Sequence, residues 1–138
     1  MTEIQIIDLE THVTKDIHDG HQNGNLTVIW RDWDNILKNP PKMMYLTSVN
    51  PREIKGPHLH SLRTSYFTCV EGKVMIIVQD SDGNYQEIES SSEKPNLICI
   101  PKNFASAHIN ISSNISKILV LADIAWKPGD NEMKNVEF

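Results

Sequence analysis

The sequence predicts an all-β domain, a sandwich or barrel of short antiparallel strands. No long segment of the 138 residues has the apolar period of a helix. Short runs rich in β-branched and aromatic residues recur, and turn signals separate them about every 8–12 residues. No linker, internal repeat or low-complexity run interrupts them, so we expect one domain spanning residues 1–138, with about nine or ten strands.

The first part of the chain contains three strand candidates. Residues 26–30 (Leu-Thr-Val-Ile-Trp) are the clearest of these, because β-branched and aromatic side chains favour strands. Residues 16–25 carry Gly, Asn and Asp and predict a loop or hairpin tip. The other expected elements are strands at 4–9 and 43–49, a helical turn within 31–37 and a turn region at 51–57.

The second part of the chain reads as a series of hairpins. Residues 80–84 (Asp-Ser-Asp-Gly-Asn) are a strong hairpin tip between two strand candidates. A polar tail is expected from Pro128 onwards. The strands expected here lie at 66–70, 73–79, 85–88, 97–100, 107–111 and 117–125.

Charge and cysteine content narrow the class of protein. The chain has 13 basic and 18 acidic side chains, which argues against a general nucleic-acid or membrane-surface binder. Cys69 and Cys99 lie in apolar runs without metal-type spacing and are expected to be buried free thiols of a reducing compartment. No signal region or membrane-length apolar run is visible, so we expect a cytoplasmic protein.

Two histidines mark the candidate site. His58 and His60 are two residues apart, and in an extended segment such side chains point to the same face. Lys55 and Arg63 flank them with positive charge. Two imidazoles that share a pocket suit metal binding or proton transfer near neutral pH.

The spacing around these histidines resembles the two-part signature of the cupin superfamily. Its first part is His-x-His, then Glu, then Gly, and here Ser65 occupies the Glu position and Gly72 is in register. Its second part, Pro-x-Gly-x-x-His-x-x-x-Asn, is matched in spacing by residues 101–110, with Ser106 in place of His. The resemblance implies a cupin-type jelly-roll β-barrel of about ten short antiparallel strands.

The two serines bear on metal binding. A metallo-cupin holds its ion with two His, a Glu and a third His, whereas Ser65 and Ser106 are poor ligands for a divalent transition metal. We therefore expect no metal and no other cofactor. The alternative is a three-histidine site, in which His108 supplies the third imidazole.

Metal-free cupins of this kind include enzymes of nucleotide sugars. The chain resembles the dTDP-4-dehydrorhamnose 3,5-epimerases and the dTDP-sugar 3,4-ketoisomerases, whose Arg-Gly-x-His motif becomes residues 55–58. Their Ile-Pro-x-Gly-Phe-Ala-His motif is matched by residues 100–106. The late strand lacks the epimerases' tyrosine acid, and a C-terminal region with their aspartate is expected to be absent. The ketoisomerase subtype therefore fits better.

The resemblance implies a role for each candidate residue. His58 is the expected base, with His60 orienting it or returning the proton, and Asp123 is a candidate to orient a histidine. Lys55 and Arg63 are expected to meet the enolate oxygen or the diphosphate. Tyr45 or Trp126 could stack on the thymine ring, and His108 is a further candidate for substrate binding. Ser65 either donates a hydrogen bond to substrate or fills space.

The sequence thus predicts a metal-independent isomerase or epimerase of a nucleotide-linked, dTDP-type 4-keto-6-deoxysugar. Two alternatives stay open: a metallo-cupin enzyme with a three-histidine site, and a non-catalytic cupin that binds sugar nucleotides. The only partners expected are the nucleotide sugar and a second copy of the chain. Exchange of edge strands, the N-terminal strand first, would make that homodimer.

Overall fold

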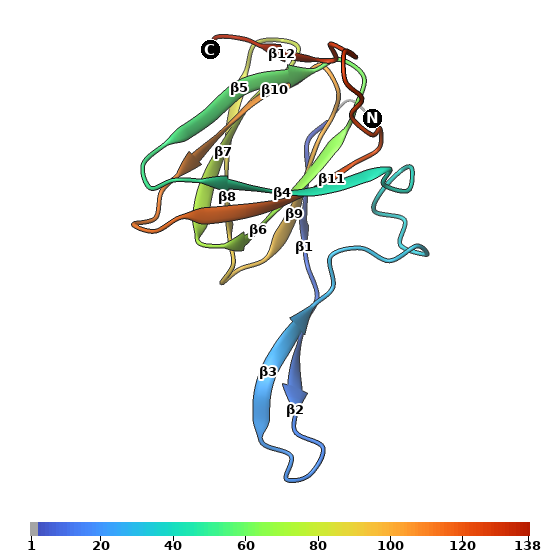
Figure 1. The fold of residues 1–138 in the computed structure, drawn as a ribbon, viewed down its shortest axis with the longest axis vertical. Helices are drawn as coiled ribbons and strands as arrows, with labels where there is room; N and C mark the ends of the chain where they lie inside the picture. The colour runs from blue at the N-terminus through green and yellow to red at the C-terminus, as the bar shows by residue number, and fades with distance from the viewer. Residues whose placement is uncertain (1–2) are drawn as a thin grey trace.

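Two five-stranded antiparallel sheets and a separate hairpin make up the fold (Figure 1). The computed structural model describes residues 3–138. The first sheet has the order β1 (Gln5–Asp8), β9 (Asn96–Ile100), β6 (Ser65–Glu71), β11 (Ser116–Ala122), β4 (Met43–Val49). The second has the order β12 (Met133–Asn135), β5 (Ile54–His60), β10 (Ala105–Asn110), β7 (Lys73–Gln79), β8 (Tyr85–Ser91). The hairpin joins β2 (Thr11–Lys15) and β3 (Gln22–Thr27).

This arrangement confirms the all-β, jelly-roll type of fold, with the strands in two facing sheets and not in one closed ring. Twelve strands form within the described residues, slightly more than expected. Over that same span no helix is long and apolar enough to cross a membrane.

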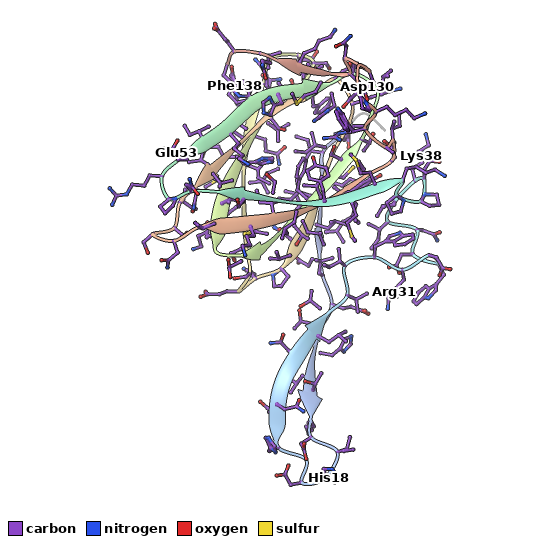
Figure 2. The ribbon with its side chains drawn as sticks, in the orientation of Figure 1. His18, Arg31, Lys38, Glu53, Asp130 and Phe138 are labelled. Carbon is purple, nitrogen blue, oxygen red and sulfur yellow. The ribbon has the colours of Figure 1, made fainter. Side chains whose placement is uncertain are left out.

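The main core lies between the two sheets. Alternate residues of β7, namely Val74, Ile76 and Val78, are fully buried, as the period of two of a strand requires. They pack with Ile118 and Val120 of β11 from the opposite sheet. Side chains fill the space between the sheets in Figure 2. This core fixes the sheets on which the candidate site is built.

A second apolar cluster covers the outer face of the first sheet. Tyr66 and Leu121 present that face, and Trp30 and Leu37 from the segment before β4 pack on it. The strand expected at 26–30 was therefore wrong beyond Thr27, because β3 ends there and Ile29 and Trp30 pack on the outer face of the first sheet. The helical turn expected at 31–37 was also wrong; the Asp34 N–H bonds the Arg31 carbonyl in an isolated turn.

The hairpin β2–β3 projects from the body of the molecule (Figure 1). Strand β2 is polar and was not expected from the sequence, and β3 begins within the segment that we expected to be a loop. His18 lies at the hairpin tip (Figure 2). At the base of the hairpin the Val28 N–H bonds the Glu10 carbonyl at 3.0 Å, so the two ends of the arm lie side by side.

The segment from Pro128 onwards, expected to be a polar tail, contains a further strand. Residues 133–135 form β12, which pairs antiparallel with β5, so that Met133 lies opposite His60 and Asn135 opposite His58. The segment expected to be a turn at 51–57 already contains the start of β5 at Ile54. Both differences concern the strand that carries the two histidines.

Candidate functional site

The candidate site is a cleft of about 370 Å³ between the two sheets, at the level of the paired histidines. A larger hollow of about 840 Å³ lies among loops near Asn50 and Ser113, but its lining has neither histidine nor cation. Titratable groups gathered in a concavity are the better indication of function. The polar lining of the smaller cleft includes Tyr45, Lys55, His58, His60, Arg63 and His108.

A β-bulge in β5 brings Lys55 to the face of the histidines. In a regular strand, Lys55 and His58 would point to opposite faces. Here β5 pairs Lys55 with His108 and His58 with Ser106, so two residues of β5 oppose the single Ala107 of β10. The bulge requires Gly56, whose φ is +98° and whose added Cβ would lie 2.8 Å from the Ser106 carbonyl oxygen. Lys55 then reaches across the cleft mouth and donates to Thr47 Oγ1 at 2.9 Å.

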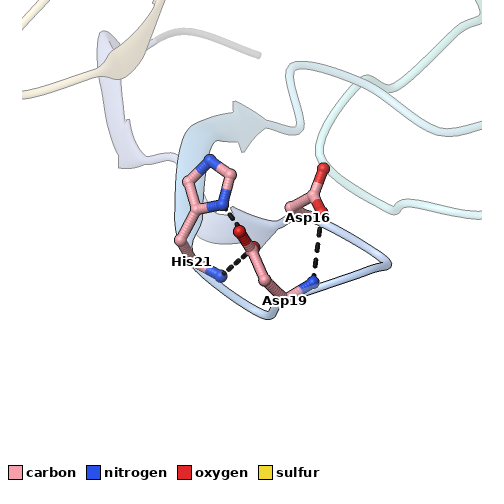
Figure 3. Close-up of side chains that lie close together, drawn as sticks. All are labelled: Asp16, Asp19 and His21. Atoms are coloured by element: carbon pink, nitrogen blue, oxygen red, sulfur yellow. Dashed lines mark hydrogen bonds and ion pairs between the residues drawn. The ribbon is translucent and has the colours of Figure 1, made fainter.

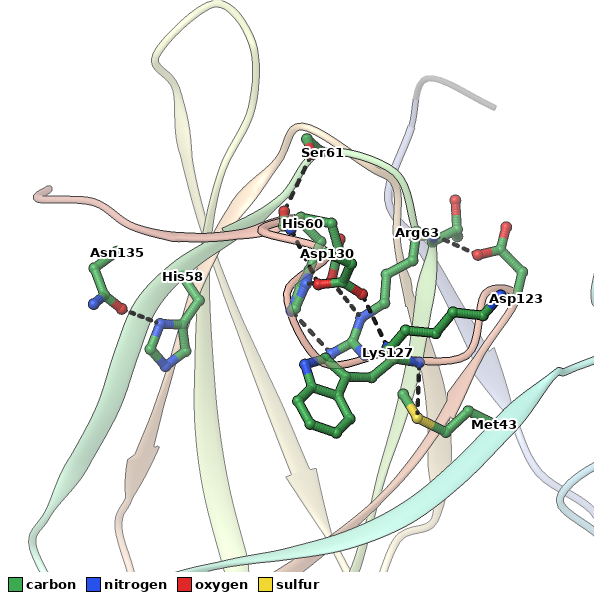
Figure 4. Close-up of polar contacts among 12 residues, drawn as sticks. Met43, His58, His60, Ser61, Arg63, Asp123, Lys127, Asp130 and Asn135 are labelled. Carbon is green, nitrogen blue, oxygen red and sulfur yellow. Dashed lines mark hydrogen bonds and ion pairs between the residues drawn. The ribbon is translucent and has the colours of Figure 1, made fainter.

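Both ring nitrogens of His60 are engaged. Its Nδ1 lies 2.5 Å from Glu132 Oε1, and its Nε2 lies 3.0 Å from a terminal guanidinium nitrogen of Arg63 (Figure 4). A guanidinium can only donate, so Nε2 is the acceptor and Nδ1 carries the proton that is donated to Glu132. Burial, and then the charge of Arg63, lower the pKa of His60, while Glu132 opposes them. His60 is thus held as a neutral ring.

His58 keeps one nitrogen open. Its Nδ1 lies 2.9 Å from the amide oxygen Oδ1 of Asn135 (Figure 4). An amide oxygen only accepts, so the proton of the neutral ring sits on Nδ1. The lone pair of Nε2 then belongs to a side chain that lines the cleft. This is the arrangement of a general base.

Arg63 is a buried cation and not a solvated loop charge. Only 7% of its surface is exposed. It donates to the Tyr45 hydroxyl oxygen at 2.8 Å, and its Nε lies 3.7 Å from Glu132 Oε1. The hydroxyl hydrogen of Tyr45 therefore stays available for another acceptor. Tyr45 belongs to β4, opposite Val120 of β11, so a phenol enters the site from the neighbour of the strand that lacks a tyrosine.

His108 lies deep in the cleft. Its ring meets Phe67 edge to face, with the ring centroids 4.8 Å apart. Burial, followed by the charges of His58 and Lys55, lowers its pKa to about 4. Its Nε2 is buried without a hydrogen-bond partner among the described residues. His108 is therefore a neutral side chain under ordinary conditions.

Three predicted site residues are not part of the lining of the histidine cleft. Asp123 accepts the Thr64 backbone N–H at 2.9 Å and lines a separate hollow with Lys38 and Lys102, so the fold does not bring it to a histidine. Trp126 is 60% exposed and is not part of the cleft lining. Ser65 is buried in a small hollow beneath Arg63, where its hydroxyl has no partner among residues 3–138.

The residues that sequence reasoning missed are Glu132 and Asn135. We expected the C-terminal region with the epimerases' aspartate to be absent; here a glutamate of the C-terminal segment meets a histidine, because Glu132 is 4% exposed and bonds His60. The Glu132 carbonyl also accepts from Ser61, which anchors the tail to the end of β5. A three-residue polar strand has no apolar periodicity from which it could be predicted. The one available indication was the presence of two side chains that can accept a hydrogen bond from histidine, Glu132 and Asn135, in this segment.

Possible metal ligands do not converge in the cleft. Within residues 3–138, the ligating atoms that lie within 4.8 Å of one another belong to Asp16, Asp19 and His21 at the hairpin tip (Figure 3). These groups are occupied with turn formation: Asp16 accepts the backbone N–H groups of His18 and Asp19, and Asp19 bonds His21. The three cleft histidines do not form such a group.

The two facing sheets, with paired histidines in the cleft between them, define a cupin-type jelly roll. Within that class, the chain belongs to the family described as FdtA: WxcM-like, C-terminal, whose sequence model matches residues 2–138. No curated protein matches the chain significantly by sequence.

Solved structures share this fold at low identity. A dTDP sugar isomerase from Desulfovibrio desulfuricans G20 superposes with a TM-score of 0.82 at 16% identity, covering 97% of this chain and 83% of that one. The dTDP-6-deoxy-D-glucose-3,5-epimerase RmlC from Legionella pneumophila, solved in complex with dTDP-4-keto-L-rhamnose, gives 0.80 at 14% identity, with coverages of 98% and 73%. The capsular polysaccharide assembling protein CapF from Staphylococcus aureus gives 0.67 at 18% identity; 72% of this chain matches 29% of that protein.

Proposed function

We propose that the chain is an isomerase that acts on a nucleotide-linked 4-keto-6-deoxysugar of the dTDP type, as a 3,4-ketoisomerase or a 3,5-epimerase. The observation that carries the proposal is the open Nε2 of His58 in a cleft that also holds Arg63 and Tyr45. The fold that is shared with a dTDP sugar isomerase and with an epimerase supports the substrate class.

The reaction begins with proton removal next to the sugar carbonyl. His58 Nε2 takes the proton, the C–H electron pair forms the C=C bond, and the carbonyl π pair moves onto oxygen. The resulting enolate oxygen needs donors that are already in place. Tyr45 supplies its hydroxyl hydrogen and Arg63 supplies charge behind it. In keto-isomerisation the proton of the C3 hydroxyl passes to the C4 oxygen and His58 returns its proton to C4, so that the carbonyl re-forms at C3. In epimerisation a second donor protonates the opposite face of the same carbon, and the carbonyl re-forms at C4.

His60 and Lys55 have different roles in this proposal. His60 has both nitrogens occupied, so it holds Arg63 in place and does not exchange protons with the sugar. Lys55, at the cleft mouth, is placed to meet the diphosphate as a point charge. Stacking of thymine on Trp126 or Tyr45, and contacts of Ser65 or His108 with substrate, stay predictions.

We propose that this chemistry needs no metal. His60 Nε2 accepts from the guanidinium of Arg63 and so has no lone pair left for an ion, and serines stand at the two remaining ligand positions of a metallo-cupin. Hydroxyl groups are weak ligands for the transition metals that imidazole prefers. We further propose that the protein is cytoplasmic, consists of one domain and works as a homodimer.

Hydrogen exchange tests the proposed function. The protein is incubated with a dTDP-4-keto-6-deoxysugar in heavy water, and deuterium next to the carbonyl is followed by NMR. We expect incorporation, and a rate about 10²- to 10⁴-fold lower in His58→Ala because the general base is lost. His12→Ala, on the exposed hairpin, is the matched control and should exchange at the wild-type rate.

Two outcomes would contradict the proposal. Binding of such sugars without any exchange would indicate a non-catalytic cupin. Exchange that disappears with a chelator and returns with a divalent metal would indicate a metal-dependent enzyme.

A further inference from the structure

The C-terminal strand holds the two histidines in different chemical states. We propose that Asn135 is a positioning residue that fixes His58 in the Nδ1–H tautomer, leaving Nε2 as the only lone pair the ring can offer to the cleft. Glu132 and Arg63 close both nitrogens of the neighbouring His60. Residues of the C-terminal segment would then give the two histidines different roles. The effect on catalysis rests on the proposed function.

Strand register places Asn135 for this task. Strand β12 runs antiparallel to β5, with Asn135 directly opposite His58 and Met133 opposite His60. Directly opposed residues project to one face of a sheet, with their Cβ atoms about 5 Å apart. The amide oxygen of Asn135 therefore meets His58 Nδ1 at 2.9 Å without leaving the strand geometry. The Val136 N–H bonds the Pro57 carbonyl and continues the pairing one step further.

The neutral amide matters as much as its position. A carboxylate at position 135 would fix the same tautomer but would also favour the charged imidazolium. The groups that face His58 are Lys55 and His60 on β5, His108 on β10, and, across the cleft, Arg63 and Tyr45. The cations among these groups are Lys55 and Arg63, and Glu132 lies 3.7 Å from Arg63 Nε. The amide of Asn135 therefore fixes the tautomer without adding a charge of its own to the site.

Ring-nitrogen NMR tests the tautomer without any substrate. Histidine-labelled protein is examined at about pH 8, where an ordinary imidazole is neutral. We expect His58 to show a protonated Nδ1 and an unprotonated Nε2. Asn135→Leu removes the acceptor and should move the proton mainly to Nε2, whereas Asn135→Asp keeps an acceptor and should keep the Nδ1–H form.

Lys134→Ala is the matched control. Lys134 lies on the same strand next to Asn135 and opposite Leu59, and Lys134→Ala should leave both histidine rings unchanged. All of these changes fall on exposed residues of a short edge strand, so the variants are expected to fold. Circular dichroism and the melting temperature check this.

Kinetics supply the second readout. We expect Asn135→Leu to lower kcat by about 10²-fold with little change in KM, because Nε2, which faces the substrate, then carries the proton and has no lone pair to act as a base. Asn135→Asp should retain far more activity, with the acid limb of its kcat/KM profile moved to higher pH.

The two proposals fail separately. A protonated Nε2 on wild-type His58, or an unchanged tautomer in Asn135→Leu, would overturn the positioning role whatever the activity. The expected tautomers, together with no exchange on any keto-sugar, would support the positioning role and leave the proposed function without support.

Discussion

His108 is the residue whose protonation the fold opposes most clearly. Its pKa is about 4 in the folded chain, against about 6.5 for an exposed histidine. Between these values the unfolded chain binds a proton that the folded chain does not, so the free energy of unfolding falls as pH falls from about 6.5 to 4. Above pH 6.5 both states are neutral and the contribution is constant. The lowered pKa of His60 acts in the same direction.

We therefore predict that His108→Leu makes the protein less sensitive to acid. Urea unfolding at several pH values should show that the wild-type free energy of unfolding falls between pH 6.5 and 4, and that His108 accounts for about 3 kcal/mol of the fall. In the variant the fall should be smaller by this contribution. His12→Leu, at an exposed hairpin position, should leave the pH slope unchanged. An identical slope for His108→Leu and wild type would mean that His108 is charged or solvated in the folded protein.

At the scale of elements, β5 owes its chemistry to one irregularity. Without the bulge at Gly56, the cationic Lys55 would leave the face of His58 and His60. We predict that Gly56→Ala destabilises the fold by about 2–4 kcal/mol, because the added Cβ meets the Ser106 carbonyl and the backbone is strained. Gly129→Ala shares the positive φ but meets nothing within 4 Å, so it should cost only about 1 kcal/mol. Urea midpoints of the two variants, if equal, would exclude the clash.

The same elements show how far sequence reasoning reaches. Strands with strong apolar alternation were located to the residue, as for β4 and β7. The polar strands β2 and β12 were missed, because their partners and not their own composition make them strands. Ile29 and Trp30 were misassigned, since burial of apolar side chains on a sheet face gives the same sequence signal as pairing within a sheet.

The candidate site divides along similar lines. His58, His60, Lys55 and Arg63 are close in sequence, and the fold brings them together as expected. The partner Glu132 is 72 residues from His60, and no local pattern encodes a contact across that distance. Asp123 had the right chemistry, but a backbone N–H of Thr64 engages it instead.

At the scale of the whole molecule, the stability of the projecting β2–β3 hairpin is the property that contacts within one chain account for least. A two-stranded hairpin by itself is at best marginally stable in water. Among residues 3–138, β2 and β3 pair with no strand but each other (Figure 1). Val13 and Leu26 are each more than half exposed. Strand β1, which we expected to be exchanged, pairs with β9 of its own chain. A second copy that packs against the β2–β3 arm would account for the arm and preserve the predicted homodimer.

Shortening the arm tests this prediction. Because the Glu10 carbonyl and the Val28 N–H already bond, residues 12–26 can be replaced by two glycines without moving β1 or the segment that covers the first sheet. We expect light scattering to show a dimer for the full chain and a folded monomer for the shortened one, with the tertiary circular dichroism of the body preserved. A full chain that is monomeric at micromolar concentration would refute the homodimer. A shortened chain that still dimerises would place the interface on the sheets, where Met44 and Leu46 of the edge strand β4 are the exposed apolar residues to substitute next.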